Sequence, residues 1–110
     1  MYARVARFEG ADPEGIDQQV GEIRRQLAAG RQGQLPDDAP AEARALMETV
    51  ARFVELVDRE RGVLVGITFC ETEDDMRRAN DALNAMSPGA GAGRRASVET
   101  FEVAIDESFR

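Results

Sequence analysis

Few side chains in this sequence could do chemistry. It contains fourteen arginines, one cysteine and one tyrosine, and it has no lysine, histidine or tryptophan. The absence of lysine excludes Schiff-base catalysis. The absence of histidine removes the commonest general base and the usual proximal ligand of haem. We therefore predict that the protein has no metal centre and no cofactor.

Arginine in an apolar strand is the first candidate for a binding or catalytic group. Arg4 and Arg7 lie in the segment Tyr2–Glu9, and an extended chain places them on opposite faces. One of them is expected to point inward and pair with a carboxylate such as Glu55, Glu99 or Glu102. An inward Arg4 could polarise an oxygen atom of a ligand. The alternative is an ion pair at the surface or at a dimer interface.

The single cysteine and the single tyrosine are weaker candidates. Cys70 precedes a predicted helix, whose N-terminus could activate a thiol. A lone cysteine at a strand end is more often a small buried hydrophobic residue. Tyr2 could act as an acid or a redox group, or it could pack with its hydroxyl in water.

Length and charge restrict the class of protein. The 110 residues predict one domain over 1–110, and 43% hydrophobic with 32% charged residues is typical of a globular chain. The net charge of -7 argues against a nucleic-acid partner. No apolar run approaches the length of a membrane span, so no membrane partner is predicted. The first residues contain no apolar signal core, and a cytoplasmic protein is therefore expected.

The segment 58–86 organises the predicted fold, because it holds a hairpin turn, the most apolar strand (Val63–Cys70) and a helix capped by Thr72. The rest alternates strands, helices and loops: strand Tyr2–Glu9, helix 13–29 begun by Asp12, loop 31–40, short helix 41–50, strand 52–58 and strand 97–106. The order β-α-(α)-β-β-α-β predicts an α+β, ferredoxin-like fold with a four-stranded antiparallel sheet and helices on one face.

The strand Val63–Cys70 has two unlike faces. The larger side chains are expected to face the helices: Val63, Val65, Ile67 and Phe69. The opposite face is small and uncharged, and it consists of Leu64, Gly66, Thr68 and Cys70. Left bare, that face would be an apolar patch that monomers rarely tolerate. We predict that a second copy covers it and forms a homodimer with two sheets face to face.

The same stretch resembles a known family. The run VDRERGVLVGITFCETEDDMRRANDALNAM, together with YARVARFEG at the start, is similar to the antibiotic biosynthesis monooxygenase-like family of dimeric α+β barrel proteins. The matching residues are Ile67, Thr68, Phe69, Cys70, Glu71, Thr72 and Asp75. The resemblance implies a ferredoxin-like protomer, a dimer whose sheets form a barrel, and a cavity between the sheet and the helices.

Members of that family differ in activity. The resemblance implies either a cofactor-independent oxygenase acting on polyaromatic substrates, a haem-degrading protein or a relative with no known activity. The oxygenases and haem-degrading members tend to use tryptophan and histidine, which this chain lacks. Cys70 stands where relatives often have tryptophan.

We therefore expect a homodimeric α+β barrel protein that binds a small, largely apolar ligand and has no identifiable catalytic set. The candidate pocket residues, which could instead simply fill the core, are Phe8, Met47, Phe53, Phe69, Cys70 and Met76. One alternative is a cofactor-independent monooxygenase acting on an aromatic or polyphenolic substrate, with Arg4 polarising its oxygen. The other is a non-catalytic dimerisation module.

Overall fold

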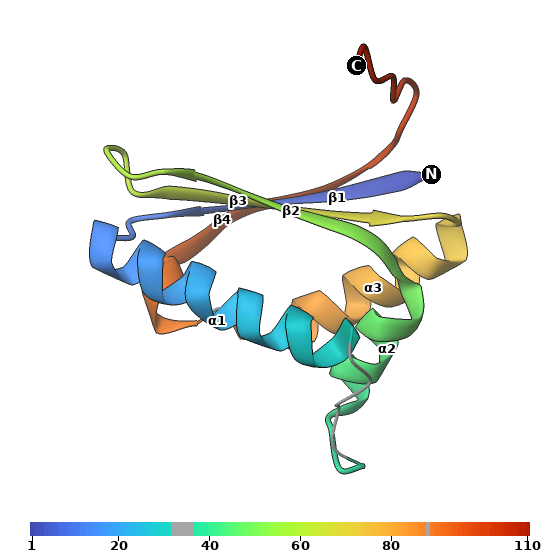
Figure 1. Ribbon diagram of the computed structural model, residues 1–110, viewed down its shortest axis with the longest axis horizontal. Helices are drawn as coiled ribbons and strands as arrows, with labels where there is room; N and C mark the ends of the chain where they lie inside the picture. The colour runs from blue at the N-terminus through green and yellow to red at the C-terminus, as the bar shows by residue number, and fades with distance from the viewer. Residues whose placement is uncertain (32–36, 88) are drawn as a thin grey trace.

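The protein consists of one sheet and one layer of helices. The computed structural model describes residues 1–31, 37–87 and 89–110, so half of the predicted loop 31–40 lies outside it. The elements in chain order are β1 (Tyr2–Glu9), α1 (Pro13–Arg31), α2 (Ala41–Thr49), β2 (Val50–Asp58), β3 (Val63–Cys70), α3 (Glu73–Ala85), the 3-10 turn η1 (Ala90–Ala92) and β4 (Arg94–Glu102). The antiparallel strands are ordered β2-β3-β1-β4, and all helices lie on one face (Figure 1). The predicted α+β, ferredoxin-like arrangement is confirmed.

The helix starts follow the predicted capping residues. The Asp12 carboxylate accepts a hydrogen bond of 2.7 Å from the Gly15 backbone N–H at the start of α1. The Thr72 hydroxyl accepts one of 3.1 Å from the Asp75 backbone N–H at the start of α3. These bonds satisfy backbone donors that a helix cannot satisfy within itself. The acidic residues after Thr72 therefore belong to a helix start.

Two strand boundaries differ from prediction. β2 begins at Val50 and not at Arg52, because an irregularity in its register with β3 carries the pairing back to the end of α2. β4 spans Arg94–Glu102 and not 97–106. Its partner β1 begins at Tyr2, opposite Glu102, so the chain beyond that pair has no strand to bond with. One further bond joins the Val103 N–H to the Met1 carbonyl at 2.9 Å.

The face of the sheet that the helices cover, here called the inner face, is the opposite of the one predicted. Arg4 identifies it, because its side chain bonds to α3, and Thr68 lies beside Arg4 in the register. The inner residues of β3 are therefore the small ones, all buried: Leu64, Gly66, Thr68 and Cys70. Small side chains let the helices approach and leave room for long side chains from β1 and β2. The prediction based on bulk was wrong.

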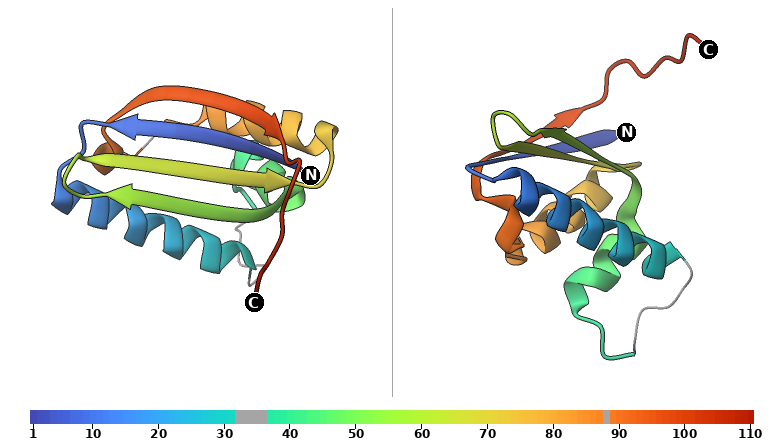
Figure 2. Two further views of the ribbon diagram at one scale, coloured as in Figure 1. Left: turned by 90° about the horizontal axis from the view of Figure 1, so that it is seen from above. Right: turned by 60° about the vertical axis from the view of Figure 1, so that its left-hand side comes forward.

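The helices bury the two halves of the inner face to different extents. Under α2 and α3, Cys70 packs with Met76 and Ala79, and all three are buried. Seen from above, α1 runs below the β2 edge and α3 below the β4 side (Figure 2). Ile16 of α1 is fully buried, but the later residues of its apolar stripe are only partly buried: Val20, Ile23 and Leu27. The half beneath α1 is therefore less completely packed.

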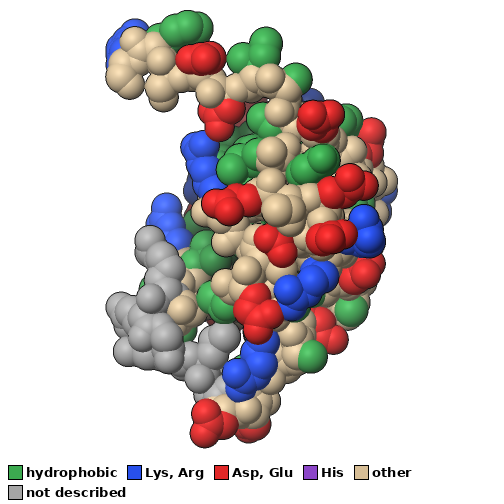
Figure 3. All heavy atoms as spheres, turned by 90° about the vertical axis from the view of Figure 1, so that its right-hand side faces the viewer, with side chains coloured by type: hydrophobic (Ala, Val, Ile, Leu, Met, Phe, Trp, Pro, Cys, Tyr) green, Lys and Arg blue, Asp and Glu red, His purple; other side chains and the backbone are tan. Residues whose placement is uncertain are grey.

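The other side of the sheet, here called the outer face, has no cover from any described residue (Figure 2). It carries apolar side chains, and Leu56 and Phe101 are 51% and 49% exposed. Hydrophobic side chains gather there beneath the C-terminal segment, with acidic side chains around them (Figure 3). That segment leaves the sheet with Ile105 and Phe109 almost fully exposed. The outer face thus has the composition of a surface that another molecule covers.

Candidate functional site

Arg4 is the central polar residue of the inner face. Only 4% of it is exposed, and its Nε and Nη2 donate hydrogen bonds of 2.9 and 2.8 Å to the side-chain oxygens of Asn80 and Asn84. Those residues are four apart, so they lie on the same face of α3. Burial, and then the neighbouring Arg95, lower the pKa of Arg4. The predicted carboxylate partners do not bond to it: two neutral amides hold this buried cation.

Arg95 lies on the same face, opposite Phe8 in the register of β1 and β4. Its Nη2 donates to the Met86 carbonyl at 3.1 Å, and its guanidinium lies 5.9 Å from the centre of the Phe8 ring. Its Nε is buried and has no hydrogen-bond partner in the described parts of the chain. The carbonyls at the end of a helix attract such a cation. Nothing in the sequence singled out Arg95.

A groove of about 430 Å³ lies between α3 and the β4 edge of the sheet, and inner-face residues line it together with Phe101 of the outer face. Its lining mixes apolar, amide, hydroxyl and charged side chains: Tyr2, Glu73, Met76, Arg77, Asn80, Thr100, Phe101 and Glu102. Asn80 is a hydrogen-bond partner of Arg4, and Thr100 faces Arg4 across the β1–β4 pair. The groove therefore reaches the residues around Arg4, and its size falls in the range of small-molecule sites.

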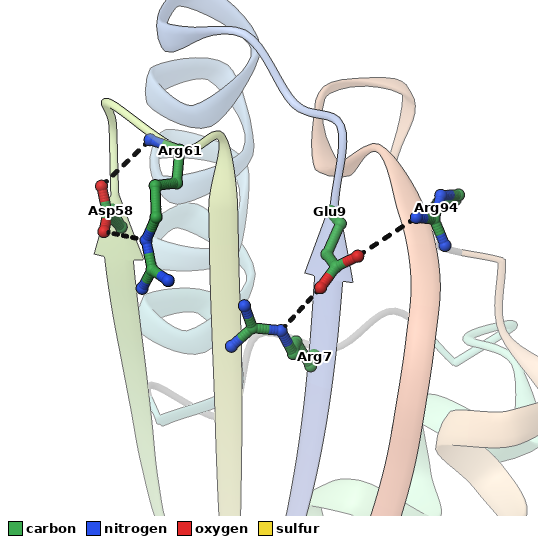
Figure 4. A network of polar contacts seen from close by, with 5 residues as sticks. All are labelled: Arg7, Glu9, Asp58, Arg61 and Arg94. Carbon is green, nitrogen blue, oxygen red and sulfur yellow. Dashed lines mark hydrogen bonds and ion pairs between the residues drawn. The ribbon is translucent and has the colours of Figure 1, made fainter.

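Arg7 lies on the outer face, as the alternation from Arg4 requires. Its Nε donates to Glu9 at 2.8 Å, and Glu9 also pairs with Arg94 at 3.1 Å. The hydrogen bond from Arg7 is the main reason that the pKa of Glu9 is lowered. A second pair, Asp58 with Arg61, lies at the same end of the sheet (Figure 4). This end of the outer face is polar, and its charges are satisfied.

The structure does not bring the six predicted pocket residues together. Phe8, Phe53, Cys70 and Met76 lie between the sheet and the helices, and only Met76 lines the groove. Phe69 is on the outer face, with the Arg52 guanidinium 5.5 Å from its ring centre, because the face assignment for β3 was inverted. Met47 of α2 is 40% exposed and packs against the backbone of Gly30.

Cys70 is a buried core residue, as the less reactive interpretation predicted. It has no exposed surface. Burial, followed by the charge of Asp75, raises the pKa of its thiol. Both effects disfavour the thiolate, so Cys70 lacks the environment of a reactive cysteine. Tyr2, at the same end of the sheet, packs against this core and lines the groove.

Glu55 was noticed in the sequence only as a partner for Arg4, and the structure gives it another place. It lies on the inner face of β2, opposite Gly66. A side chain at Gly66 would put its Cβ 3.2 Å from the Glu55 Oε2 and 3.6 Å from the Phe53 ring. Glu55 makes no hydrogen bond or ion pair with the described residues. Burial alone raises its pKa to about 7.

The inner face therefore offers hydrogen-bond donors at Arg4 and Arg95 and an unpaired carboxyl at Glu55. Within the described ranges, no group of three or more His, Cys, Asp or Glu side chains is placed to hold a metal ion. No helix in the same ranges is long and apolar enough to cross a bilayer. In comparisons with known proteins, no family model matches the chain, and no curated protein matches it significantly.

Proposed function

We propose that the protein is a homodimeric α+β barrel protein, related to the antibiotic biosynthesis monooxygenase-like family, that binds a small, largely apolar ligand on the inner face. The observation that carries the proposal is Arg4. It is a buried cation held by two neutral amides beside a groove of ligand size. The groove supplies apolar contacts, and Asn80, the partner of Arg4 that lines the groove, supplies the polar contact that orients a ligand oxygen.

The energetic cost of Arg4 supports a role beyond packing. Removing a guanidinium from water without a carboxylate partner costs several kcal/mol in principle, and apolar side chains of similar volume often stabilise a core as well or better. A chain with 21 acidic residues places none of them against Arg4 among the residues described. A ligand that carries an oxygen acceptor would supply part of the missing compensation.

The outer face supports the dimer part of the proposal. Its central positions on β1 and β3 are apolar, Val5, Val65 and Ile67 among them, and the flanking Leu56 and Phe101 are half exposed. A second sheet packed about 10 Å away would bury these side chains and close a barrel. The surface assigned to the partner is thus the opposite of the one expected from the sequence.

Ligand binding is tested by thermal unfolding in the presence of small aromatic compounds. A bound compound raises the melting temperature of the wild type, because it stabilises only the folded state. The matched variants are Arg4→Met and Arg7→Met, which remove one inner and one outer arginine. The compound should still stabilise Arg7→Met and have little effect on Arg4→Met. Equal stabilisation of both variants would show that Arg4 is not part of the site.

The dimer is tested by light scattering at micromolar concentration. The wild type should have twice the mass of one chain. Ile67→Arg places a charge at the centre of the outer face and should give a folded monomer, since an unpaired charge is costly in a buried interface. A wild-type protein that is monomeric at this concentration would refute the proposed barrel.

A second candidate, a cofactor-independent oxygenase acting on a polyphenolic substrate, is favoured by one observation. The inner face carries both an unpaired carboxyl, Glu55, and a guanidinium, Arg4. In such a reaction a substrate methylene becomes a carbonyl with one atom of O₂, and the other oxygen leaves as water with the two hydrogens. The test is O₂ consumption without added metal or flavin, and its loss in Arg4→Ala. A pure dimerisation module would show neither binding nor O₂ consumption.

A further inference from the structure

We propose that Glu55 is the proton-exchanging contact of the inner face, and that it takes the hydroxyl group of a phenolic or enolic ligand. The inference deepens the proposed function and rests on it for the small, apolar character of the ligand. It adds a polar group on the ligand and names the residue that recognises it. Four features of the surroundings support it: the space, the access, the lack of partners and the protonation state.

The space for the Glu55 carboxyl comes from small residues in one row of the sheet. Glu55 lies opposite Gly66, and Gly66 lies opposite Ala6, so the row continues from β2 to β1 without a large side chain. Two strand spacings separate the ends of this row, roughly 10 Å. The Glu55 carboxyl lies over Gly66, where a Cβ would come within 3.2 Å of its Oε2. The Glu55 carboxyl and the Phe53 ring thus occupy the place that the missing Gly66 side chain leaves.

The access comes from the incomplete packing of α1 against β2. Phe53 and Glu55 are only partly buried although they face the helix layer, and Val57 on the same face is 37% exposed. The facing stripe of α1 is also only partly buried, as described above. Two apolar surfaces that faced each other and were fully packed would both be buried. The helix layer therefore does not seal this carboxyl from the solvent.

The charged groups of the neighbouring elements leave Glu55 unpaired. On β1, Arg4 is bound to Asn80 and Asn84, and on β3 the one titratable inner residue is the core residue Cys70. On α1, Asp17 pairs with Arg59, and Glu22 pairs with Arg25. None of these groups bonds to Glu55. The carboxyl oxygens therefore have no donor from the described residues, and they keep some exposure to solvent.

The protonation state suits exchange with a hydroxyl group. Because burial raises the pKa of Glu55 to about 7, both protonated and ionised forms are present at neutral pH. A base with such a pKa is suited to accept a proton near neutrality. The step moves one proton from the hydroxyl oxygen of the ligand to a carboxylate oxygen of Glu55. It leaves a phenolate or enolate oxygen and a neutral carboxyl, and no oxidant is required.

The alternative hypothesis is that Glu55 turns to solvent at the edge strand and behaves like any exposed carboxyl. The two hypotheses predict different reactivity of the Glu55 carboxyl towards dicyclohexylcarbodiimide. This apolar reagent adds to protonated carboxyls, and the acylisourea first formed rearranges to a stable N-acylurea. An exposed, ionised carboxyl in water reacts little.

The test is labelling of the folded wild-type protein, followed by mass spectrometry of the intact chain and its peptides. We expect one adduct, on Glu55, at about pH 6, and roughly a hundredfold less at about pH 9, where the carboxyl is ionised. Glu60, exposed in the β2–β3 turn, is the internal control and should stay unlabelled. Gly66→Ala, which narrows the space over β3, should slow the labelling. Labelling of Glu60 as fast as Glu55, or no labelling of Glu55, would overturn the proposal.

The hydroxyl preference is tested with a matched pair of probes. 2-Naphthol should protect Glu55 from the reagent, and 2-methoxynaphthalene, which has the same rings but no hydroxyl hydrogen, should protect it much less. Equal protection by both, or by neither, would overturn the hydroxyl assignment. The carbon-13 shift of the Glu55 carboxyl against pH gives its titration without any variant, and an ordinary acidic midpoint would also overturn the proposal. Failure of the binding function itself is detected separately, by the thermal unfolding of Arg4→Met and Arg7→Met with the compound.

Discussion

The two halves of the space beneath the sheet differ in how completely they are packed. On the α3 side, the polar residue Arg4 has two amide partners, and the surrounding Cys70, Met76 and Ala79 are buried. On the α1 side, the polar residue Glu55 has no bonded partner among the described residues, and the helix stripe above it is partly exposed. Packing is thus closer under α3, where Arg95 Nε is the buried side-chain atom without a partner among the described residues, and the unpaired carboxyl of Glu55 lies under α1. Functional sites often carry such locally unfavourable features.

The largest predicted effect comes from removing Arg4, the hydrogen-bonded residue on the α3 side. Arg4→Ala should lower the free energy of unfolding by about 2 to 4 kcal/mol, because it leaves Asn80 and Asn84 without their donor and opens a cavity. Arg7→Ala, on the outer face, should cost less than about 1 kcal/mol. Denaturant unfolding of both variants measures the difference. Equal losses would contradict the description of Arg4 as a buried, bonded residue.

Adding volume to each half sharpens the comparison further. Ala79→Leu overpacks the side under α3 and should cost about 1 to 3 kcal/mol. Val20→Leu adds a methylene group to the α1 stripe, where the packing is incomplete, and should cost less than about 0.5 kcal/mol. Thermal unfolding of the two variants tests the contrast. A Val20→Leu variant as unstable as Ala79→Leu would show that the α1 side is fully packed.

Glu55→Gln should stabilise the protein at neutral and alkaline pH, but not in acid solution. The pKa of Glu55 in the folded state, about 7, lies above the ordinary 4.5. Its contribution to stability is therefore complete below the ordinary pKa and is lost as the pH rises through about 7. The glutamine variant lacks this loss and should exceed the wild type by about 1 to 2 kcal/mol at about pH 9, allowing for partial exposure, and match it at about pH 4. A pH-independent difference would rule out a raised pKa.

A smaller effect concerns the start of the well-packed helix. Thr72→Ala removes the hydroxyl that accepts the Asp75 N–H, and it should cost about 1 kcal/mol. Thr72→Ser keeps the acceptor and should recover most of that loss. Chemical unfolding of both variants provides the measurement, and an identical cost for serine and alanine would assign the effect to packing.

Local signals predicted the elements well, because each begins or ends at residues with a strong local preference. Asp12 and Thr72 cap helices, and β3 ends where the apolar run ends. The end of β4 could not be predicted in this way, since it depends on where its partner β1 begins. A strand boundary that depends on a partner strand cannot be predicted from the residues around it in the sequence.

The site was less predictable than the fold. Alternation placed Arg4 and Arg7 on opposite faces, but which face the helices cover depends on packing between elements and not on side-chain size. Because the covered face was predicted wrongly, Phe69 was placed on the inner face and the dimer surface was placed on the wrong side of the sheet. Glu55 gave one usable signal, a carboxylate between Phe53 and Val57 on the same face of β2. Its lack of a partner is a property of the tertiary structure.

The claim that the inner face is a ligand site is tested most directly by amide NMR spectra recorded during a titration with 2-naphthol. The account predicts that the largest shift changes fall on inner-face residues of the sheet and on α3, with Gly66, Asn80 and Thr100 among them. It also predicts that 2-methoxynaphthalene changes the resonances near Glu55 less. Shift changes confined to the outer face, around Leu56 and Phe69, would contradict the account, and so would a spectrum that the compound leaves unchanged.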